Sequence, residues 1–343
     1  MEHDPAGVLR RIAYLLERDL AESYKVRAFR KAAATVDATE PDHLARLAQV
    51  KRLKDLDGIG DTSGRIIAEV LAGVVPPYLA ELEATTTLPV LEEAGLKIRA
   101  QLQGDCHSHS DWSDGGSPIE EMACAARALG HAYVALTDHS PRLTVAHGLD
   151  STRLLAQLEV VEGLNEKMAP FRILTGIEVD ILEDGTLDQD EALLSRLDVV
   201  VASVHSKLRM EPRQMTNRMI RAVESPHTDI LGHCTGRLIV GKGRPQSTFD
   251  AEAVFDACAR TGTAVEINSR PERRDPPHEL LVRALDQGCV VTIDTDSHAP
   301  GQFEWLPFGC EQAAAAGLAG CVDRIMNARS AEDLLAWAAS HAA

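Results

Sequence analysis

From about residue 100 onward, short apolar runs alternate with helical stretches of 10–20 residues. This alternation is typical of strands joined by helices in a parallel sheet. Seven runs in about 240 residues predict an α/β fold, a (βα)7 barrel one unit short of a TIM barrel. An open doubly wound sheet is the alternative. The runs lie at 102–106, 132–140, 171–181, 197–206, 228–236, 263–269 and 289–298.

Each run carries, at or near its end, polar residues able to bind a cation or move a proton. They are His107 and His109, Asp138 and His139, Glu178 and Asp180, His205, His233, Glu266 and Asn268, and Asp296 and His298. The carboxyl ends of barrel strands meet at one face, so six of the thirteen histidines are expected at one mouth. A single histidine at a strand end is more often a core or surface residue, but six beside acids favour a metal site.

Strand alternation supports this interpretation, because side chains two residues apart share a face. His107 and His109 are therefore expected to point the same way, as are Asp296 and His298. Nitrogen and oxygen ligands without sulfur suit Zn²⁺, Mn²⁺ or Fe²⁺.

Charge and composition narrow the function classes. The net charge of −17 argues against nonspecific nucleic-acid binding by the whole molecule. Residues 101–343 carry a net −15, whereas residues 10–31 carry +4. The seven cysteines are scattered without a CxxC pair, and neither a long apolar span nor a signal peptide is present. We therefore expect a cytoplasmic protein that does not associate with membranes.

The first part of the chain has helical periodicity over 6–36, 42–54 and about 62–72. Gly58-Ile59-Gly60 forms a turn before the last of these segments, and its exposed amides could hold a phosphate. A simple helix–helix turn is the alternative. The expected organisation is a helical domain at 1–85, a linker at 86–99 and a barrel domain at 100–343.

The second domain resembles the PHP (polymerase and histidinol phosphatase) family. The matching motifs, in order, are "HSH" (107–109), "SDG" (113–115), "TDHS" (137–140), "GIEVDI" (176–181), "SVHS" (203–206), "GHCTGR" (232–237) and "DTDSH" (294–298). The resemblance implies three divalent metal ions in a distorted barrel. One ion would take His107, His109, Glu178 and Asp296. A second would share Glu178 and add His205 and His233. The third would take Asp114, His139 and His298.

The first domain resembles the helix-hairpin-helix domain of bacterial family X DNA polymerases, through "ESYKVRAFRKAA" (22–33) and "LDGIGDTSGRIIAEVLAG" (56–73). The polymerase palm is missing, so polymerase activity is not expected. Arg65 stands where lyase members carry a Schiff-base lysine, so lyase activity is not expected either. The residues expected to contact DNA are Lys25, Arg27, Arg30, Lys31, Gly58 and Gly60.

Together these features predict a phosphoesterase that uses metal-bound hydroxide. Its catalytic residues would be Glu178, His107, His233 and Asp296. Substrate would be held by Lys207, Arg237, Asn268 and Arg273, with Arg270 as a further candidate, while Asp138 and Asp180 would orient the histidines.

The favoured hypothesis is a DNA-repair nuclease, a 3′–5′ exonuclease or an enzyme that processes 3′ ends or abasic sites. Its partners would be DNA and a separate polymerase. The alternatives are a phosphatase of the histidinol-phosphate type and a non-enzymatic DNA-binding module.

Overall fold

The structure, a computed structural model, describes residues 4–341. Two compact units divide the chain between Leu88 and Pro89. No helix among the described residues is long and apolar enough to cross a membrane.

The first unit is entirely helical. Its helices are α1 (Pro5–Arg18), α2 (Ser23–Asp37), α3 (Pro41–Gln49), α4 (Asp61–Leu71) and α5 (Pro77–Thr85). The periodicity predicted over 6–36 is split into α1 and α2, because the chain turns at Leu20, whose φ is +56°. The apolar faces of these helices form one core, which includes Leu9, Ile12 and Ile66. The unit therefore has a hydrophobic core of its own.

The predicted glycine turn lies between a short 3₁₀ helix, Leu53–Asp55, and α4. Gly58 has a φ of +78°, which side chains rarely adopt. A Cβ at this position would also lie 2.8 Å from the side chain of Lys31. Glycine is therefore needed here for the turn to form against α2.

The second unit begins with α6 (Glu93–Arg99) and continues as a barrel. Its strands are β1 (Gly104–Asp105), β2 (Tyr133–Leu136), β3 (Arg172–Asp180), β4 (Val199–Ser203), β5 (Ile230–Leu231), β6 (Ala264–Asn268) and β7 (Val291–Asp294). They pair in sequence order, every pair parallel. The predicted barrel of seven parallel strands after a helical domain is confirmed.

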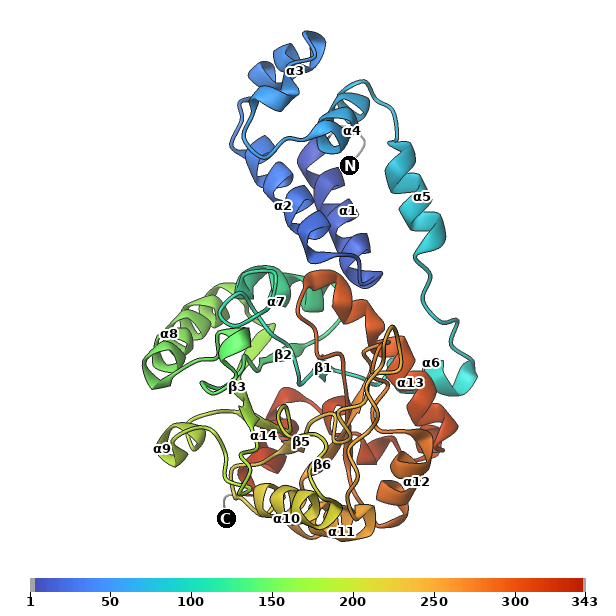
Figure 1. Cartoon of the computed structure of the whole chain (residues 1–343). Helices are drawn as coiled ribbons and strands as arrows, with labels where there is room; N and C mark the ends of the chain where they lie inside the picture. The colour runs from blue at the N-terminus through green and yellow to red at the C-terminus, as the bar shows by residue number, and fades with distance from the viewer. Residues whose placement is uncertain (1–3, 342–343) are drawn as a thin grey trace. The chain divides into compact units, whose positions relative to one another are not determined.

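Helices follow the strands and surround the barrel (Figure 1). They are α7 (Ile119–Ala128), α8 (Ser151–Met168), α9 (Glu191–Leu194), α10 (Pro212–Val223), α11 (Ala251–Thr261), α12 (His278–Asp286), α13 (Leu306–Ala315) and α14 (Ala331–Ala339). Because helices cover the strands on the outside and the interior is filled, both faces of each strand are buried, which explains their continuous apolar runs.

Alternation along each strand decides which side chains enter the barrel. On β4, Val199 and Val201 belong to the interior cluster, while Val200 packs outward with the helices. On β3, Ile177 and Val179 pack outward, so Glu178 between them points inward. The same periodicity that builds the core therefore delivers Glu178 to the mouth of the barrel.

The barrel closes between its first and last strands through irregular backbone and side chains. Ser108 and Ser297 form an isolated parallel bridge, and the His109 amide donates to the Ser297 carbonyl at 2.7 Å. The Cys106 amide donates to Asp294 Oδ1 at 2.6 Å. The segments that close the barrel are thus the same segments that carry four of the predicted ligands.

The strands are shorter than the apolar runs predicted. β1 ends at Asp105 and β7 at Asp294, so His107, His109, Asp296 and His298 lie beyond them. Asp296 has a left-handed φ of +53°. Simple strand alternation is therefore the wrong reason for expecting these pairs to point together. Loop geometry directs them, and such uncommon backbone is concentrated at functional sites.

One buried histidine lies outside the mouth and predicts acid sensitivity. His131, between α7 and β2, faces Phe303 edge-on, and its ring nitrogens have no hydrogen-bond partner among the described residues. Burial, with the nearby charge of Arg99, lowers the pKa of His131 to about 3. Below pH 6.5 the unfolded chain therefore binds a proton at His131, whereas the folded chain does not. The free energy of unfolding consequently falls as the pH drops from 6.5 toward 3.

Replacing His131 with leucine should remove this contribution to the pH dependence of the free energy of unfolding. Between about pH 7.5 and 5.5 the native protein should lose about 1.4 kcal/mol more unfolding free energy than His131→Leu. Urea unfolding of both proteins in chelator at each pH measures the difference. The exposed His147, replaced in the same way, is the control and should lose as much as the native protein. An equal pH dependence in His131→Leu would contradict the assignment.

Candidate metal centre

All nine predicted metal ligands come together at the mouth of the barrel. Four groups of side chains have ligand atoms within 4.8 Å of one another. They are His109, Asp114, His139 and His298; His107, Glu178 and His233; His107, His109 and Asp296; and His139, Glu178 and His205.

Glu178 lies at the centre of these groups. Its Oε1 is 2.9 Å from His233 Nε2 and 3.2 Å from His205 Nε2. Its Oε2 is 2.9 Å from His139 Nδ1. His107 and His109 approach the same carboxylate at 3.4 and 3.6 Å. One carboxylate within reach of five imidazoles suits a group that bridges two cations.

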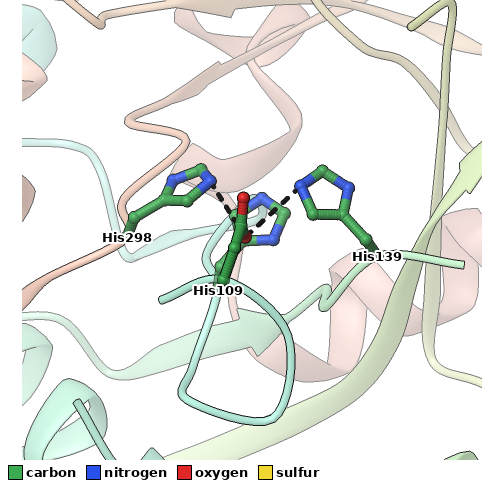
Figure 2. A group of neighbouring side chains, drawn as sticks. His109, His139 and His298 are labelled. Carbon is green, nitrogen blue, oxygen red and sulfur yellow. Dashed lines mark ion pairs between the residues drawn. The ribbon is translucent and has the colours of Figure 1, made fainter. Parts of the chain in front are cut away.

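A second carboxylate organises the outer group. Figure 2 shows the rings of His109, His139 and His298 converging on one region, with dashed lines for the ion pairs of the group. Asp114 Oδ1 lies 3.5 Å from His139 Nε2 and 3.4 Å from His298 Nε2. This group contains the three residues that the family resemblance implies for the third ion, and adds His109.

The grouping differs from the implied one in two respects. His139 turns Nδ1 to Glu178 and Nε2 to Asp114, so it belongs to two groups. His205 and His233 both approach Glu178 but fall in different groups. The described side chains thus bring the expected residues together without reproducing the expected division among three ions.

Unpaired polar atoms at the centre indicate that a cation belongs there. His107 Nε2, His109 Nε2 and Glu178 Oε2 are buried, and none has a hydrogen-bond partner among the described residues. Leaving buried polar groups unpaired is costly, and a divalent cation would satisfy several at once. The nitrogen and oxygen donors present fit Zn²⁺, Mn²⁺ or Fe²⁺.

The surroundings of Glu178 and of His109 keep these two side chains in the forms that bind metals. Burial opposes ionisation of Glu178, but His205, His107 and His139 outweigh it and hold its pKa well below the ordinary value. Burial and the rings of His298 and His139 lower the pKa of His109 to about 3. A carboxylate and a neutral imidazole are the forms that bind metals.

Hydrogen bonds behind the ligands fix their ring orientation. Glu266 Oε1 lies 2.6 Å from His107 Nδ1, and Asp180 Oδ1 lies 3.0 Å from His205 Nδ1. The Asp296 carbonyl lies 2.9 Å from His298 Nδ1. A proton on Nδ1 of His107 and of His205 leaves Nε2 of each ring free for a cation, the usual arrangement for metal-binding histidines. His298 Nδ1 also lies 3.1 Å from Arg270 Nη1, which can only donate.

Two supporting roles differ from those expected. Glu266 lies on the sixth predicted strand, where the sequence pattern gives it no role; its position two residues before Asn268, on the same face, is the signal that points to the centre. Asp138 was expected to orient a histidine. Instead it accepts hydrogen bonds from Ser110, Ser113 and Gln157, and so holds the loop between His109 and Asp114.

The predicted substrate-binding residues separate into two kinds. Arg273 Nε lies 3.3 Å from Asp296 Oδ2, and its Nη1 has no hydrogen-bond partner in the described chain. Lys207 is exposed two residues after His205. Arg270 donates to the Asp296 carbonyl at 3.1 Å and pairs with Glu272 at 2.7 Å. Lys207 is therefore free to bind an anion, whereas Arg273 keeps Nη1 without a hydrogen bond to the described residues beside its ion pair with Asp296.

The side chains of Arg237 and Asn268, which the sequence predicts to hold substrate, are bonded to other parts of the protein instead. The Arg237 guanidinium donates to the carbonyls of Arg273 and Arg274, so it holds that loop instead of reaching for substrate. Asn268 Nδ2 donates to Asp296 Oδ2 at 3.2 Å and to Glu266 Oε2 at 3.3 Å. Its amide therefore positions two carboxylates of the centre.

Metal loading should stabilise the protein. Cations that bind the folded mouth but not the unfolded chain add about 2.7 kcal/mol per site at a hundredfold excess over Kd. The expected result is a rise in Tm of about 5 °C or more when Mn²⁺ or Zn²⁺ is added to chelator-stripped protein. Thermal unfolding followed by circular dichroism measures this shift. An unchanged Tm with Mn²⁺, Zn²⁺ and Fe²⁺ alike would contradict a metal centre.

Comparison with known proteins agrees with both units. The PHP domain family model matches residues 105–270, and a helix-hairpin-helix domain model matches residues 2–73. The DNA polymerase/3′-5′ exonuclease PolX of Bacillus subtilis (strain 168) is 40% identical over 266 residues. That match covers 77% of this chain but only 45% of the relative, so the chain spans about half of that protein's length.

A probable phosphatase of Thermoanaerobacter sp. (strain X514) is 32% identical over 215 residues, covering 58% of this chain and 82% of the relative. The crystal structure of histidinol phosphate phosphatase from Lactococcus lactis aligns over 63% of this chain and 94% of its own, with a TM-score of 0.44 and 18% identity.

These matches and the nine clustered candidate ligands define the class: the chain is a PHP-domain, metal-dependent phosphoesterase. Within that class it belongs with PHP proteins that carry an N-terminal helix-hairpin-helix domain, the arrangement found in PolX-like proteins. The described residues between the two matched regions form α5, α6 and their connections, without a polymerase palm.

Proposed function

We propose that this chain hydrolyses phosphodiester bonds in DNA, as a 3′–5′ exonuclease or an enzyme that processes 3′ ends or abasic sites. The observation that carries the proposal is the joining of a helix-hairpin-helix unit to a phosphoesterase barrel in one chain. A phosphatase for small molecules has no evident need of the helical unit. The architecture of the PolX relative, named as a polymerase and a 3′-5′ exonuclease, also supports DNA as the substrate.

The helical unit offers a site suited to a DNA backbone. Lys25 of α2 and Gly58 and Gly60 of the turn line one pocket of about 540 Å³, with Tyr24 and Phe29 beside them. The pocket includes the start of α4, where unpaired amides favour an anion. Lys54 pairs with Asp61 at that helix start and offsets its negative charge. A phosphate at this pocket would meet one ammonium group and the backbone amides.

The other basic residues expected to contact DNA differ in availability. Arg27 is exposed on α2. Lys31 is also exposed but lies 2.9 Å from Asp57, whose pKa it lowers. Arg30 is bonded to the buried Glu17 at 2.6 Å. We therefore assign DNA contact chiefly to Lys25, Arg27 and the two glycines, and assign Arg30 to the core of the unit.

At the barrel mouth, divalent cations would activate water and neutralise the charge that develops on the phosphate. His107, His233, Glu178 and Asp296 would hold them at the centre, and His109, Asp114, His139, His205 and His298 around it. Arg273 would place Nη1, which has no hydrogen-bond partner among the described residues, on a phosphate oxygen, because guanidinium matches that geometry. Asn268 would keep the Asp296 carboxylate in place.

A phosphatase acting on small phosphomonoesters is the second candidate. It is favoured by the net charge of −15 over residues 101–343 and by relatives named as probable phosphatases. We propose no lyase activity, because Arg65 on α4 pairs with Glu69 and cannot readily form a Schiff base. Resynthesis after trimming would require a separate polymerase.

The test is a digestion assay with purified protein and Mn²⁺. The substrates are 5′-labelled single-stranded and recessed DNA and, in parallel, histidinol phosphate. His107→Ala is the control for contaminating nuclease. A ladder of shortened DNA that is absent with the variant supports the proposal. Phosphate release from histidinol phosphate while DNA stays intact would favour the phosphatase.

A further inference from the structure

A hairpin projects from the chain just after the ligand His233. Its stem pairs Leu238 with Arg244 through two backbone hydrogen bonds of 2.9 and 2.8 Å. Gly241 and Gly243, with φ of +68° and +65°, allow the tight reversal between the stem residues. We call residues 237–244 the rim hairpin.

The stem is fastened to the wall of the metal centre. The Ile239 amide donates to the Glu272 carbonyl at 2.7 Å, and the Arg237 guanidinium bonds to the next two carbonyls. The segment that receives these bonds also carries Arg273, which pairs with Asp296. Arg244 Nε donates to the Gly236 carbonyl at 2.6 Å. The rim hairpin is therefore held at the mouth by its base.

The tip has an unusual surface. Ile239 and Val240 are 52% and 57% exposed, although both are large aliphatic residues that water disfavours. Lys242, also exposed, follows them. Residues 230–249 contain three basic residues and no aspartate or glutamate, within a domain that carries −15 over residues 101–343. The tip thus combines an apolar edge with local positive charge, on a hairpin whose base is bonded to the loop that carries Arg273.

We propose that the rim hairpin is a wedge, in which Ile239 and Val240 pack against the terminal base pair of a DNA end and separate its 3′ nucleotide from its partner. This inference rests on the proposed function. A paired 3′ end must open before its last phosphodiester can reach ligands as deeply buried as Glu178. Aliphatic side chains inserted at a base step stabilise the opened state, and Lys242 suits the adjacent phosphate.

The apolar surface and the positive charge of the tip together favour DNA over a small phosphate ester as its ligand. A small phosphomonoester bound at the metal centre offers no extended apolar face to Ile239 and Val240. A base pair offers flat apolar faces next to negative phosphates, which matches both properties of the hairpin. We therefore expect the rim hairpin to increase the rate of hydrolysis at paired 3′ ends and to have no effect at ends that are already unpaired.

The test compares Ile239→Ser/Val240→Ser with the native protein, residues 1–343, in Mn²⁺. Substrates are recessed duplex DNA with a paired or a mismatched 3′ terminus, single-stranded DNA, and bis(p-nitrophenyl) phosphate. The rate of hydrolysis at the paired end should be about tenfold lower for the variant, which is the effect expected from losing one stacking contact. The variant should keep its rate on the other three. Leu155→Ser/Val160→Ser, two exposed aliphatics on α8, is the matched control and should match the native rates.

A binding measurement separates opening from hydrolysis. With 2-aminopurine at the paired 3′ terminus and a phosphorothioate at the last linkage, the native protein should raise fluorescence as the base unstacks. The double variant should give a smaller rise. Equal native and variant rates on paired ends would overturn the wedge while leaving DNA hydrolysis in place. An equal loss on all four substrates would also overturn it. Native protein that hydrolyses only the small diester would overturn both proposals.

Discussion

Replacing Glu178 with glutamine should lower phosphoester hydrolysis by more than about a thousandfold and reduce the bound metal. The substitution keeps the size of the side chain but removes the charge that faces His233, His205 and His139. Without that charge, two groups of ligands lose their shared anion, and the repulsion between two neighbouring cations is no longer offset. Hydrolysis of bis(p-nitrophenyl) phosphate and metal content by mass spectrometry are the two measurements.

The matched control is Glu183→Gln, an exposed glutamate five residues further along the chain. It should retain native activity and native metal content. Circular dichroism spectra that coincide with those of the native protein would establish that Glu178→Gln is folded. A folded Glu178→Gln protein with full activity and full metal content would refute the bridging role of this carboxylate.

Removing residues 1–88 should lower the rate on DNA by about a hundredfold or more while leaving the small diester rate unchanged. The truncated protein would lose the contacts between the helical unit and the DNA phosphates. The binding energy of such contacts is electrostatic and depends strongly on salt. The barrel unit should survive the truncation, because the buried apolar cluster that contains Leu9 and Ile66 draws all its residues from the helical unit. Rates on single-stranded DNA at two salt concentrations measure the effect.

A charge reversal tests the same surface without truncation. Lys25→Glu/Arg27→Glu should weaken DNA hydrolysis and flatten its salt dependence. Lys51→Glu/Arg52→Glu, on an exposed segment of the same unit, is the matched control and should have the smaller effect. DNA hydrolysis that is equal with and without the helical unit would contradict its role in docking.

Much of this molecule could be predicted without coordinates, because the relevant signals are local. The apolar runs around Val199–Ser203 and Ala264–Asn268 predict strands, since both faces of a covered parallel strand are apolar. The convergence of histidines such as His205 and His233 follows from parallel topology, which brings all carboxyl strand ends to one face. The ligand types predict divalent metal because imidazole and carboxylate chemistry does not depend on the fold.

Other features depended on contacts between distant segments. His107 and Glu266 are 159 residues apart, and no local pattern announces that they meet at 2.6 Å. The loss of Arg237 as a substrate ligand follows from two carbonyls 36 and 37 residues further on. The sequence does not distinguish an arginine that is bonded to backbone carbonyls from one that is available to bind substrate.

The sequence by itself determined the class of fold and the gathering of imidazoles and carboxylates at the barrel mouth, because strand periodicity and side-chain chemistry are properties of short segments and single residues. Only the tertiary structure decided how the ligands divide into groups, which acids orient the histidines and which arginines stay free. Those outcomes depend on the positive φ of Asp296, the closure of the barrel through Ser108 and Ser297, and the packing of loops from separate strands. Each of these is set by the whole barrel at once, so no segment of the chain encodes it alone.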